Sequence, residues 1–501
     1  MPIAILRDAA RAHPDRPAVV AGGRTVTYAQ LVARSDALAA RLRARGIDRC
    51  AIAVADRIDA IALLAAASAA GVEACVYPAT LDAADIAAHA DRFAHDTVVV
   101  DDDPTAARGP QAPDPAVLVA TEGAGRRGPA GPGATEGAGP RRPDTGVGDR
   151  PILLPLADLE TGSTDAATVG GVGAGTADAA HAPLLVLTTG TTGAPKGVRH
   201  DWSRLAAGVH GTPVADGDRW LLAYNLNQFG GLQVLLHALA HHGTVVVPRS
   251  SHAADVLDAL RRERVTHLSG TPTFWRIVVG GLAPGDVDGL ELRQITLGGE
   301  PVPDRLLERI AGLFPTARIT HVYAATEAGT VVAVSDGRAG LPTTVLDRDE
   351  DASVRLRVAD GELHVRTPIT VAPGDGPDDG WLATGDLVEE RDGRLRFVGR
   401  TVEIINVGGA KVHPLPIEER ILAVDGVDAA AVHGSPNPVT GQIVAVDVVT
   451  APGAEEDAVR TAIQRACADL PAPGRPRRIR FVDELRIRGD KVVRNPNGES
   501  S

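Results

Sequence analysis

Short apolar runs and longer amphipathic segments alternate through the first hundred residues. The runs at 17–20 and 24–27 flank Gly22 and Gly23 and predict a hairpin. Further apolar runs predict three strands, at 51–55, 74–77 and 97–100. Helical periodicity predicts helices at 28–45, 59–70 and 82–89. Because this alternation is typical of parallel strands joined by helices, we expect a mostly parallel sheet covered by helices.

The pattern is lost between residues 101 and about 182. Gly, Pro, Ala and Thr dominate there, and the segment 121–129 is nearly repeated at 135–143. Such a composition buries too little apolar surface to offset the entropy of ordering the chain. We therefore expect a flexible low-complexity insertion, within which only 151–156 has the pattern of a strand.

The alternation resumes after the insertion and continues to about residue 322. Apolar runs predict strands at 184–187, 220–224, 244–248, 267–270, 292–297 and 318–322. Helices are expected between them, at 231–239 and 253–264. Residues 331–397 then predict short antiparallel strands, with turns at 336–337, 360–361 and 392–393 and a further turn at WLATGDL, 381–387.

A second, smaller unit is expected after residue 399. Helices at 416–423 and 455–470 and strands at 429–434 and 443–449 form an α+β pattern of ordinary domain size. We therefore predict an α/β protein with a large N-terminal domain (1–398), which combines parallel-rich sheets and helices with a small β-barrel-like part. A small mobile α+β C-terminal domain (399–501) follows, with its hinge at 399–402.

The stretch LLVLTTGTTGAPKGVR, at 184–199, has the composition of a phosphate-binding loop after a buried strand. Glycines allow backbone N–H groups to turn inward, threonines add hydroxyl donors, and one lysine adds a compact charge. The candidates are Thr188, Thr189, Gly190, Thr191, Thr192, Gly193 and Lys196. The spacing differs from a P-loop, because Gly197 stands where Ser or Thr would follow the lysine.

Charge and cysteine usage narrow the class of protein. A net charge of −13 argues against a nucleic-acid or anionic-membrane surface. No apolar run is long enough to span a bilayer, and the N-terminus lacks the pattern of a secretory signal. Three cysteines without metal-ligand spacing predict reduced thiols and a cytoplasmic protein. Only three of the 51 basic residues are lysines, at 196, 411 and 491, and all three fall in candidate motifs.

The motif TTGTTGAPKG resembles the phosphate-binding loop of the adenylate-forming superfamily, which includes acyl-CoA and aryl-CoA synthetases, peptide-synthetase adenylation domains and luciferases. TVTYAQL (25–31) and GVEACVYPA (71–79) resemble weaker motifs of the same superfamily. The resemblance implies an enzyme that uses ATP and Mg²⁺ to activate a carboxylic acid as an acyl-adenylate. It also implies transfer of the acyl group to a thiol, of coenzyme A or of phosphopantetheine on a carrier protein.

The nucleotide and metal residues follow from three further motifs. The two glycines of the turn Gly298, Gly299, Glu300 allow a flat ring to lie against the backbone. The resemblance implies that this ring is adenine. In YAATEAG (323–329), Tyr323 can stack on a purine, Thr326 can bond the α-phosphate and Glu327 can hold Mg²⁺. By resemblance, Asp386 and Arg400 bind the ribose.

The catalytic-lysine loop of the family resembles LRIRGDKVVRN (485–495), which makes Lys491 the catalytic candidate. An extra Asp490 separates it from Gly489, but the spacing to Arg494 is kept. A thiol or pantetheine arm is expected to approach the residues Gly408, Gly409 and Lys411. The hinge carries Val402 where the family usually has Asp or Lys, and Asn406 replaces a frequent Lys.

The resemblance locates the acid pocket in YNLNQFGG (224–231), SGTPTFWRIV (269–278) and the strand end before Thr326. Gln228 stands where the family often has His, which favours a small or polar acid over a long fatty tail. The pocket candidates are Asn225, Asn227, Gln228, Phe229, Gly231, Thr271, Phe274 and Ala325.

Several alternatives stay open at this point. The acceptor can be coenzyme A, a carrier-protein pantetheine or an amine, the last including relatives that activate nitrite for diazotisation. A non-catalytic nucleotide sensor is the alternative from another class, although Thr326, Glu327, Asp386, Arg400 and Lys491 together argue against it. The sequence leaves the acid and the oligomeric state unidentified.

Overall fold

The structure is a computed structural model of the whole chain. It describes residues 2–102, 151–161, 183–188, 195–209, 217–280, 282–349, 352–368, 380–451, 453–485, 487–488, 491–492 and 494. Most of the expected insertion therefore lies outside the described residues, as do Thr189, Gly190, Thr191, Thr192 and Gly193. Of Lys491 only the backbone is described.

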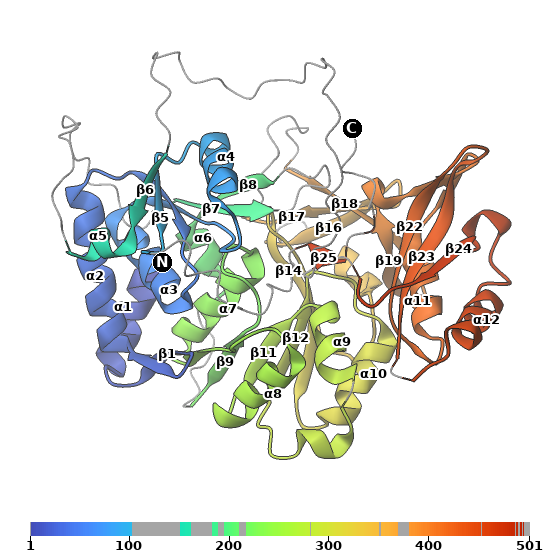
Figure 1. Cartoon of the computed structure of the whole chain (residues 1–501), viewed down its shortest axis with the longest axis horizontal. Coiled ribbons are helices and arrows are strands. Elements are labelled where there is room, and N and C mark those ends of the chain that lie inside the picture. The colour runs from blue at the N-terminus through green and yellow to red at the C-terminus, as the bar shows by residue number, and fades with distance from the viewer. Residues whose placement is uncertain are drawn as a thin grey trace, which may run out of the picture.

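A six-stranded sheet forms the N-terminal layer, at the left of Figure 1. Its order is β6-β5-β3-β4-β7-β8, and every pair is parallel except β7 with β8. The strands are β3 (Arg49–Ala53), β4 (Glu73–Val76), β5 (Thr97–Val100), β6 (Ile152–Pro155), β7 (Pro183–Thr188) and β8 (Lys196–Asp201). The parallel core of this sheet is confirmed.

Strand β8 corrects the expectation that Lys196 belongs to a loop. Lys196 begins the strand and pairs with Thr188 across the β7–β8 hairpin. Val198 and His200 are buried and alternate with exposed Arg199, which is the two-residue period of a half-buried strand. The glycine-rich neighbourhood hid that period.

The second sheet has eight strands in the order β14-β13-β12-β11-β9-β10-β1-β2. Its pairs are parallel from β13 to β1 and antiparallel at both edges. The strands are β1 (Pro17–Ala21), β2 (Arg24–Thr27), β9 (Arg219–Leu222), β10 (Thr244–Val247), β11 (His267–Gly270), β12 (Gln294–Gly298), β13 (Arg318–Ala325) and β14 (Gly329–Val334). The predicted hairpin at the start of the chain is confirmed as β1–β2.

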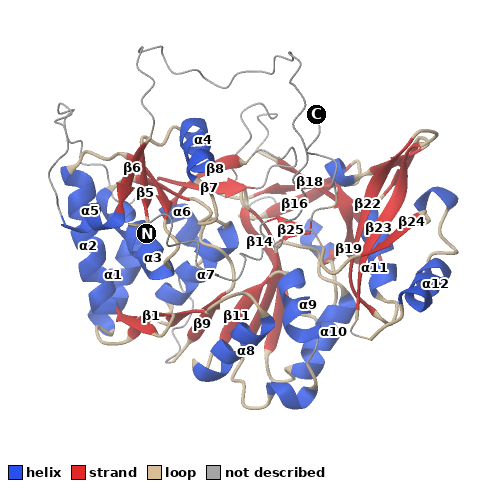
Figure 2. Ribbon diagram, in the orientation of Figure 1, coloured by secondary structure: helices blue, strands red, loops and turns tan. Residues whose placement is uncertain are grey.

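Helices cover both sheets, as expected (Figure 2). Those of the first half are α1 (Pro2–Ala12), α2 (Tyr28–Ala44), α3 (Arg57–Ala70), α4 (Ala83–Phe93), α5 (Leu156–Thr161), α6 (Trp202–Ala207) and α7 (Phe229–Ala240). The second sheet also carries α8 (Ala253–Arg262), α9 (Pro272–Gly280) and α10 (Asp304–Leu313). One apolar core joins α1, α2, α3 and α7 to strands of both sheets.

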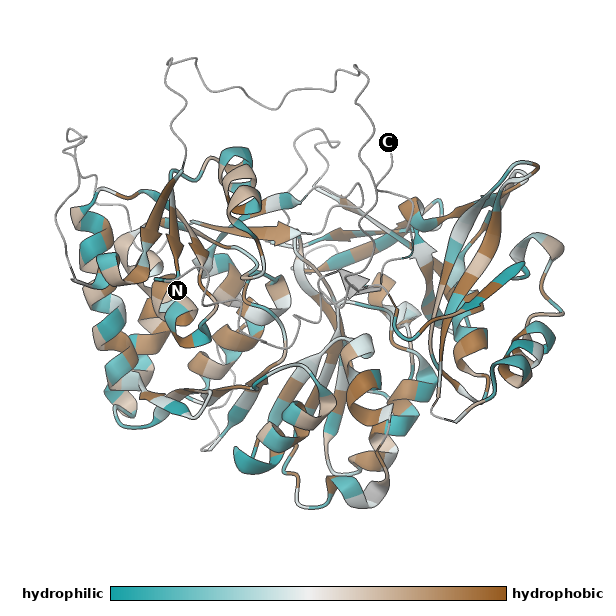
Figure 3. Ribbon diagram, viewed as in Figure 1, coloured by the Kyte–Doolittle hydropathy of each residue, from teal (hydrophilic) through white to brown (hydrophobic). Residues whose placement is uncertain are grey.

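Local sequence explains where two of these helices begin. Thr27 caps α2 by accepting a hydrogen bond from the Gln30 backbone, and the Gln30 side chain accepts one in return from the Thr27 backbone. Asp56 caps α3 in the same position, and Gly71 ends that helix with a φ of 76°. The Ala-rich α3 is buried on nearly all sides. In Figure 3, which is coloured by hydropathy, the apolar strands β5 and β6 beside it are brown.

A five-stranded antiparallel sheet follows, in the order β15-β19-β18-β17-β16. Its strands are β15 (Leu341–Pro342), β16 (Arg355–Ala359), β17 (Glu362–Arg366), β18 (Leu382–Arg391) and β19 (Arg394–Arg400). The predicted turns at 360–361 and 392–393 are confirmed, because both residues of each have positive φ, as a tight hairpin turn requires.

The expected turn at WLATGDL is wrong, because most of that motif lies inside β18. Pairing with β17 on one side and β19 on the other holds the segment extended. Gly385 takes a φ of 75°, and the β18–β19 register shifts just after it, between Leu387 and Val388. The turn-like composition of TGD therefore marks an irregularity within a strand.

A fourth sheet, with antiparallel and parallel pairs, follows Arg400 and lies at the right of Figure 1. It contains β20 (Ile405–Val407), β21 (Ala410–Val412), β22 (Val427–Asn437), β23 (Gly441–Thr450) and β24 (Arg478–Phe481), covered by α11 (Pro414–Leu422) and α12 (Glu456–Ala466). The short pair β25 (Ile487–Arg488) and β26 (Lys491–Val492) completes the chain. The α+β pattern is confirmed, whereas the boundary at 399 stays a prediction.

Among the helices of the described residues, none combines the length and apolarity that a membrane crossing requires.

One buried and two half-buried histidines predict sensitivity to acid. Burial lowers the pKa of His95, His237 and His267 from 6.5 to about 4. The unfolded chain therefore takes up protons first as the pH falls below 6.5. We expect the free energy of unfolding to fall between pH 6.5 and 4, by up to about 1.4 kcal/mol per pH unit for each histidine. Denaturant titrations at a series of pH values measure this slope.

His95 offers the sharpest variant, because it is 2% exposed and its Nδ1 lies 2.7 Å from the Tyr77 hydroxyl. His95→Gln should make the free energy of unfolding less dependent on pH. His252→Gln changes an exposed histidine before α8 and should follow the wild type. A His95→Gln protein with the wild-type slope would contradict the assignment.

Candidate active site

Four of the predicted motifs follow strands of the eight-stranded sheet at the same edge. They come after β9, β11, β12 and β13, which are parallel to one another. The carboxyl ends of parallel strands share one edge of a sheet, which is where α/β proteins bind ligands. The topology therefore brings together segments 224–231, 271–274, 298–300 and 323–327.

Tyr323, Asp386 and Arg400 meet beside this edge. The Tyr323 hydroxyl donates a hydrogen bond to Asp386 Oδ2 at 2.8 Å. Arg400 Nε lies 3.0 Å from Asp386 Oδ1, and Arg400 Nη2 donates to the carbonyl of Thr384 at 2.8 Å. Residues 77 positions apart in the chain thus form one polar cluster, as nucleotide binding would require.

The two strands that carry Asp386 and Arg400 explain their contact. Asp386 on β18 and Arg400 on β19 are Cα partners across the antiparallel pair. The Tyr323 ring packs against the ring of Phe397, also on β19, at a centroid distance of 5.2 Å. Burial raises the pKa of Tyr323, and the Asp386 charge adds to that effect. The phenol therefore stays protonated and can donate to the carboxylate.

The turn after β12 is held by hydrogen bonds to its backbone and to the Glu300 side chain. The Tyr224 hydroxyl donates to the Gly298 carbonyl at 3.3 Å, and Gly299 takes a φ of 86°. The Glu300 carboxylate instead accepts hydrogen bonds from the backbone and hydroxyl of Thr273, at 2.9 and 2.7 Å. Glu300 therefore holds the start of α9, a role that the sequence did not indicate.

The predicted acid segment is tied together by its own polar groups. The Asn225 backbone N–H donates to Gln228 Oε1 at 3.2 Å, and Gln228 N donates to the Asn225 carbonyl at 3.1 Å. Arg57, at the start of α3, donates to Asn225 Oδ1. A Cβ at Gly231 would lie 2.1 Å from the Asn225 carbonyl oxygen, so only glycine fits there. Asn227 and Phe229 are half-buried in the same segment.

The other predicted pocket residues border the same edge. Thr271 is 2% exposed, and its hydroxyl accepts a hydrogen bond from the Phe274 backbone at 3.0 Å, which caps α9. Phe274 packs against the core beneath that helix, and its ring lies 6.2 Å from that of Trp275. Ala325 ends β13 and packs against the core of the antiparallel sheet.

His200 is a site residue that the sequence analysis missed. It is 4% exposed on β8, and its ring centroid lies 6.2 Å from that of Phe229. Burial lowers the pKa of His200, and a hydrogen bond with the Thr326 backbone partly opposes the shift. His200 therefore links β8 to the acid segment and to the Thr326 loop. The two-residue burial period of β8 was the available signal.

The remaining candidates lie on surfaces or in part outside the described residues. Thr188 and Lys196 face each other at the end of the β7–β8 hairpin, where the Thr188 hydroxyl donates to the Lys196 carbonyl at 3.5 Å. Gly408 and Gly409 form the tip of the β20–β21 hairpin, and Lys411 is exposed beside it. The Gly408 N–H donates to the Thr440 carbonyl at 2.9 Å.

Glu327 follows Thr326 and is half-buried. The described residues contain no group of three or more His, Cys, Asp and Glu side chains arranged to hold a metal ion. A single carboxylate is sufficient for Mg²⁺ when phosphate oxygens and water supply the other ligands. The donor set around Glu327 therefore fits magnesium bound together with a polyphosphate.

The fold is that of an α/β protein whose parallel strands end at an edge where such proteins bind ligands. Comparison with protein families makes the class specific. Residues 6–374 match the family described as AMP-binding enzyme, and residues 416–489 match the AMP-binding enzyme C-terminal domain. The chain belongs to the AMP-binding enzyme family.

Relatives in this family include several CoA ligases. The 3-[(3aS,4S,7aS)-7a-methyl-1,5-dioxo-octahydro-1H-inden-4-yl]propanoyl:CoA ligase of Mycobacterium tuberculosis is 30% identical, over 67% of this chain and 71% of its own. Feruloyl-CoA synthase of an Amycolatopsis species is 31% identical over 55% of this chain, and 2-succinylbenzoate–CoA ligase of Bacillus velezensis is 30% identical over 52%. The match spans 60% and 57% of these last two proteins.

Solved structures share the fold over nearly the whole chain. The o-succinylbenzoate CoA synthetase of Bacillus subtilis, in complex with its acyl-adenylate, has a TM-score of 0.69 at 22% identity and covers 99% of this chain and 98% of its own. The amide bond synthetase McbA of Marinactinospora thermotolerans has a TM-score of 0.69 at 23% identity, covering 98% of each chain. The arrangement of sheets described above is thus that of known adenylate-forming enzymes.

The Asp386 cluster predicts a specific effect on nucleotide affinity. Asp386→Asn keeps the size of the side chain but removes the charge that pairs with Arg400 and the second acceptor oxygen. We expect ATP to bind about tenfold more weakly, because a charge-assisted hydrogen bond contributes about 1.5–3 kcal/mol and the amide retains part of it. Isothermal titration calorimetry with Mg·ATP measures the dissociation constant.

Asp392→Asn supplies the matched control. Asp392 is an exposed carboxylate in the turn of the same β18–β19 hairpin, and asparagine tolerates its φ of 52°. Its dissociation constant for ATP should equal that of the wild type. Unchanged ATP affinity in Asp386→Asn would remove this carboxylate from the nucleotide site.

Proposed function

We propose that the protein is an ATP-dependent ligase that activates a small or polar carboxylic acid, aryl acids included, as an acyl-adenylate and transfers the acyl group to coenzyme A. The observation that carries the proposal is the convergence of Tyr323, Asp386 and Arg400 at the edge where the parallel strands end. Membership of the AMP-binding family and CoA-ligase relatives support it.

The first half-reaction forms the acyl-adenylate. A carboxylate oxygen of the acid attacks the α-phosphorus of ATP, the bond from that phosphorus to the bridging oxygen breaks, and pyrophosphate leaves. Side chains contribute by positioning and by neutralising charge. Asp386 and Arg400 hold the ribose, the turn at Gly298 and Gly299 faces adenine, and Thr326 bonds the α-phosphate.

Three groups neutralise the phosphate charge in this scheme. The glycine- and threonine-rich segment from Thr188 to Lys196 holds the β- and γ-phosphates. Lys491 lies against the α-phosphate and the attacking oxygen. Glu327 would be the protein ligand of Mg²⁺, which when bound would supply positive charge beside the phosphates.

The second half-reaction transfers the acyl group. The sulfur of a thiol attacks the acyl carbon, the bond from that carbon to the AMP oxygen breaks, and the thiol proton is lost to solvent as AMP leaves. We infer that the C-terminal part rotates about residues 400–402, so that Lys491 withdraws. Gly408, Gly409 and Lys411, exposed on the β20–β21 hairpin, then border the pantetheine arm.

The acid segment supports a polar or aromatic substrate. Asn225 and Gln228 present amides, Phe229 an aromatic face, and His200 a buried imidazole between them and Thr326. Two relatives are named for aromatic acids, ferulate and 2-succinylbenzoate. The three cysteines are buried and unpaired, which supports a cytoplasmic location.

Acid-dependent exchange of pyrophosphate into ATP tests the first half-reaction. With a panel of aryl, short aliphatic and long-chain acids and Mg·ATP, we expect labelled pyrophosphate to enter ATP with a subset of the small or aryl acids. Omission of the acid or chelation of Mg²⁺ should abolish exchange. Mass analysis of the product with coenzyme A, a phosphopantetheinylated carrier or an amine then identifies the acceptor. A wild-type protein that exchanges pyrophosphate into ATP with none of the acids in the panel would refute the proposal and favour a nucleotide sensor.

Lys491→Ala should separate the two half-reactions. Exchange should fall by about 100-fold or more, because a charge that stabilises the transition state is lost. Transfer from a supplied acyl-adenylate to coenzyme A should stay within about threefold of the wild type, since this step does not use the lysine. Lys411→Ala, on the thiol side, should show the opposite pattern. Equal loss of both activities in Lys491→Ala would contradict the proposal that the C-terminal part takes a different position in each half-reaction.

A further inference from the structure

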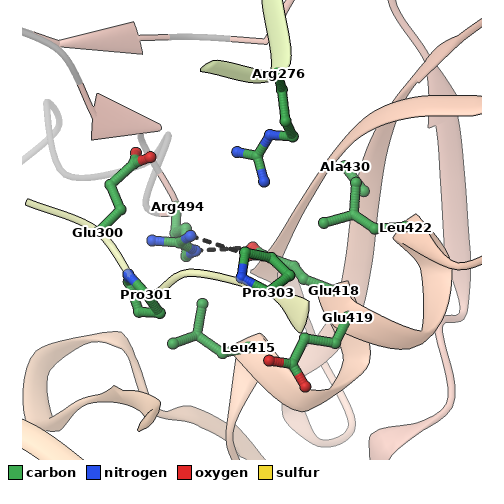
Figure 4. A pocket seen from close by; sticks show the side chains of 10 residues that line it. All are labelled: Arg276, Glu300, Pro301, Pro303, Leu415, Glu418, Glu419, Leu422, Ala430 and Arg494. Carbon is green, nitrogen blue, oxygen red and sulfur yellow. Dashed lines mark hydrogen bonds and ion pairs between the residues drawn. The ribbon is translucent and has the colours of Figure 1, made fainter. Parts of the chain in front are cut away.

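A charged pocket lies between the turn after β12 and the first helix of the C-terminal part. Arg276, Glu300 and Pro303 line it from the eight-stranded sheet, and Leu415, Glu418 and Arg494 line it from the C-terminal part (Figure 4). Arg494 belongs to the last described segment of the chain, three residues after Lys491. Its guanidinium is joined to Glu418 by dashed lines in Figure 4, and Glu300 lines the pocket on the side away from Glu418.

The Arg494 side chain is fixed to the C-terminal part by two carboxylates. Its Nε and Nη2 donate to the two oxygens of Glu418 on α11, at 2.7 and 3.0 Å, a bidentate pair. Its Nη1 lies 3.5 Å from Glu403 Oε1, in the segment after Arg400. Glu418 is itself held, because its Oε1 accepts the backbone N–H of Val432 at 2.8 Å. Arg494 is 17% exposed and Glu418 6%, so water competes little for this pair.

A third carboxylate acts on Arg494 from the other side of the pocket. Burial lowers the pKa of Arg494, but the charges of Glu418, Glu403 and Glu300 outweigh it and raise the pKa. Glu300 is fixed by its two hydrogen bonds from Thr273, whose hydroxyl also accepts one from Arg276 at 2.9 Å. The large part of the protein thus presents a rigid negative charge to an arginine of the C-terminal part.

We propose that Arg494 is a positioning residue of the adenylation half-reaction. It anchors the segment that carries Lys491, and its attraction to the Glu300 carboxylate holds this segment against the end of β12. The proposal rests on the function proposed above. Three residues of extended chain span at most about 10 Å, so fixing Arg494 confines Lys491 to that distance from it. When the C-terminal part rotates, Arg494 keeps its ion pairs with Glu418 and Glu403, which move with it, and moves away from the Glu300 carboxylate. The network therefore favours adenylation and takes no part in thiol transfer.

Separate measurement of the two half-reactions tests this role. For Arg494→Gln we expect acid-dependent pyrophosphate exchange to fall by about 100-fold, the effect of a misplaced catalytic group, while transfer from supplied acyl-adenylate stays within about threefold. Arg494→Lys keeps the positive charge but loses the two parallel hydrogen bonds of the guanidinium. Its exchange should therefore lie between that of Arg494→Gln and that of the wild type. Glu300→Gln keeps an acceptor for Thr273 and should lower exchange by about twofold to fivefold, again without loss of transfer.

The chain offers a matched control in the same C-terminal part. Arg480 on β24 makes a bidentate pair with Asp447 on β23, at 2.8 and 2.6 Å. Arg480→Gln removes a similar pair away from the pocket and should leave both half-reactions unchanged.

Several outcomes would overturn the proposal. Equal loss of exchange and transfer in Arg494→Gln would mean a purely structural role, and unchanged exchange would mean none. If Arg494→Gln does not fold, Glu300→Gln decides, because wild-type exchange in that variant would refute the link across the pocket. A wild-type protein without exchange on any acid refutes the proposed function itself, which distinguishes that failure from failure of the Arg494 role alone.

Discussion

The ion pair between Asp386 and Arg400, with the hydrogen bond from Tyr323, is the interaction on which the site depends. It joins the end of β13, in a parallel sheet, to the β18–β19 hairpin, in an antiparallel one. Arg400 is also the last residue before the segment that leads to the C-terminal part. One carboxylate thus ties together the end of the parallel sheet, the antiparallel sheet and the start of the C-terminal part. The rotation proposed for residues 400–402 would begin beside this cluster.

Most of the fold could be predicted from local patterns, and the exceptions have physical causes. Buried parallel strands such as β5 and β10 are nearly continuous apolar runs, and helices such as α2 carry their own caps, so both are visible in the sequence. Strand β8 was missed because lysine and glycine start it, and its glycine-rich neighbourhood hides its two-residue period. The TGD motif was mistaken for a turn, because only pairing with two neighbouring strands keeps it extended. Pairing partners are tertiary information that a single segment does not carry.

The candidate site shows the same division. Motifs that follow parallel strands could be brought together in advance, because topology alone places strand ends at one edge. The neighbours that each side chain contacts could not be predicted from the sequence. Glu300 and Thr271 proved to hold the start of α9, and Gly231 is required by a close approach to Asn225. His200 and Arg57 reach the acid segment from elements far away in the sequence, β8 and α3, and no local motif marks them.

Hydrogen–deuterium exchange with and without Mg·ATP tests the central claim most directly, because it locates the bound nucleotide without knowledge of the acid. The account predicts slower exchange in three segments, the end of β12 with residues 298–300, β13 with its following loop to 327, and β18–β19 around Asp386 and Arg400. The α12 helix, on the outer side of the C-terminal sheet, should exchange as before. A lack of protection in all three segments with saturating ATP would contradict a nucleotide site built on Asp386.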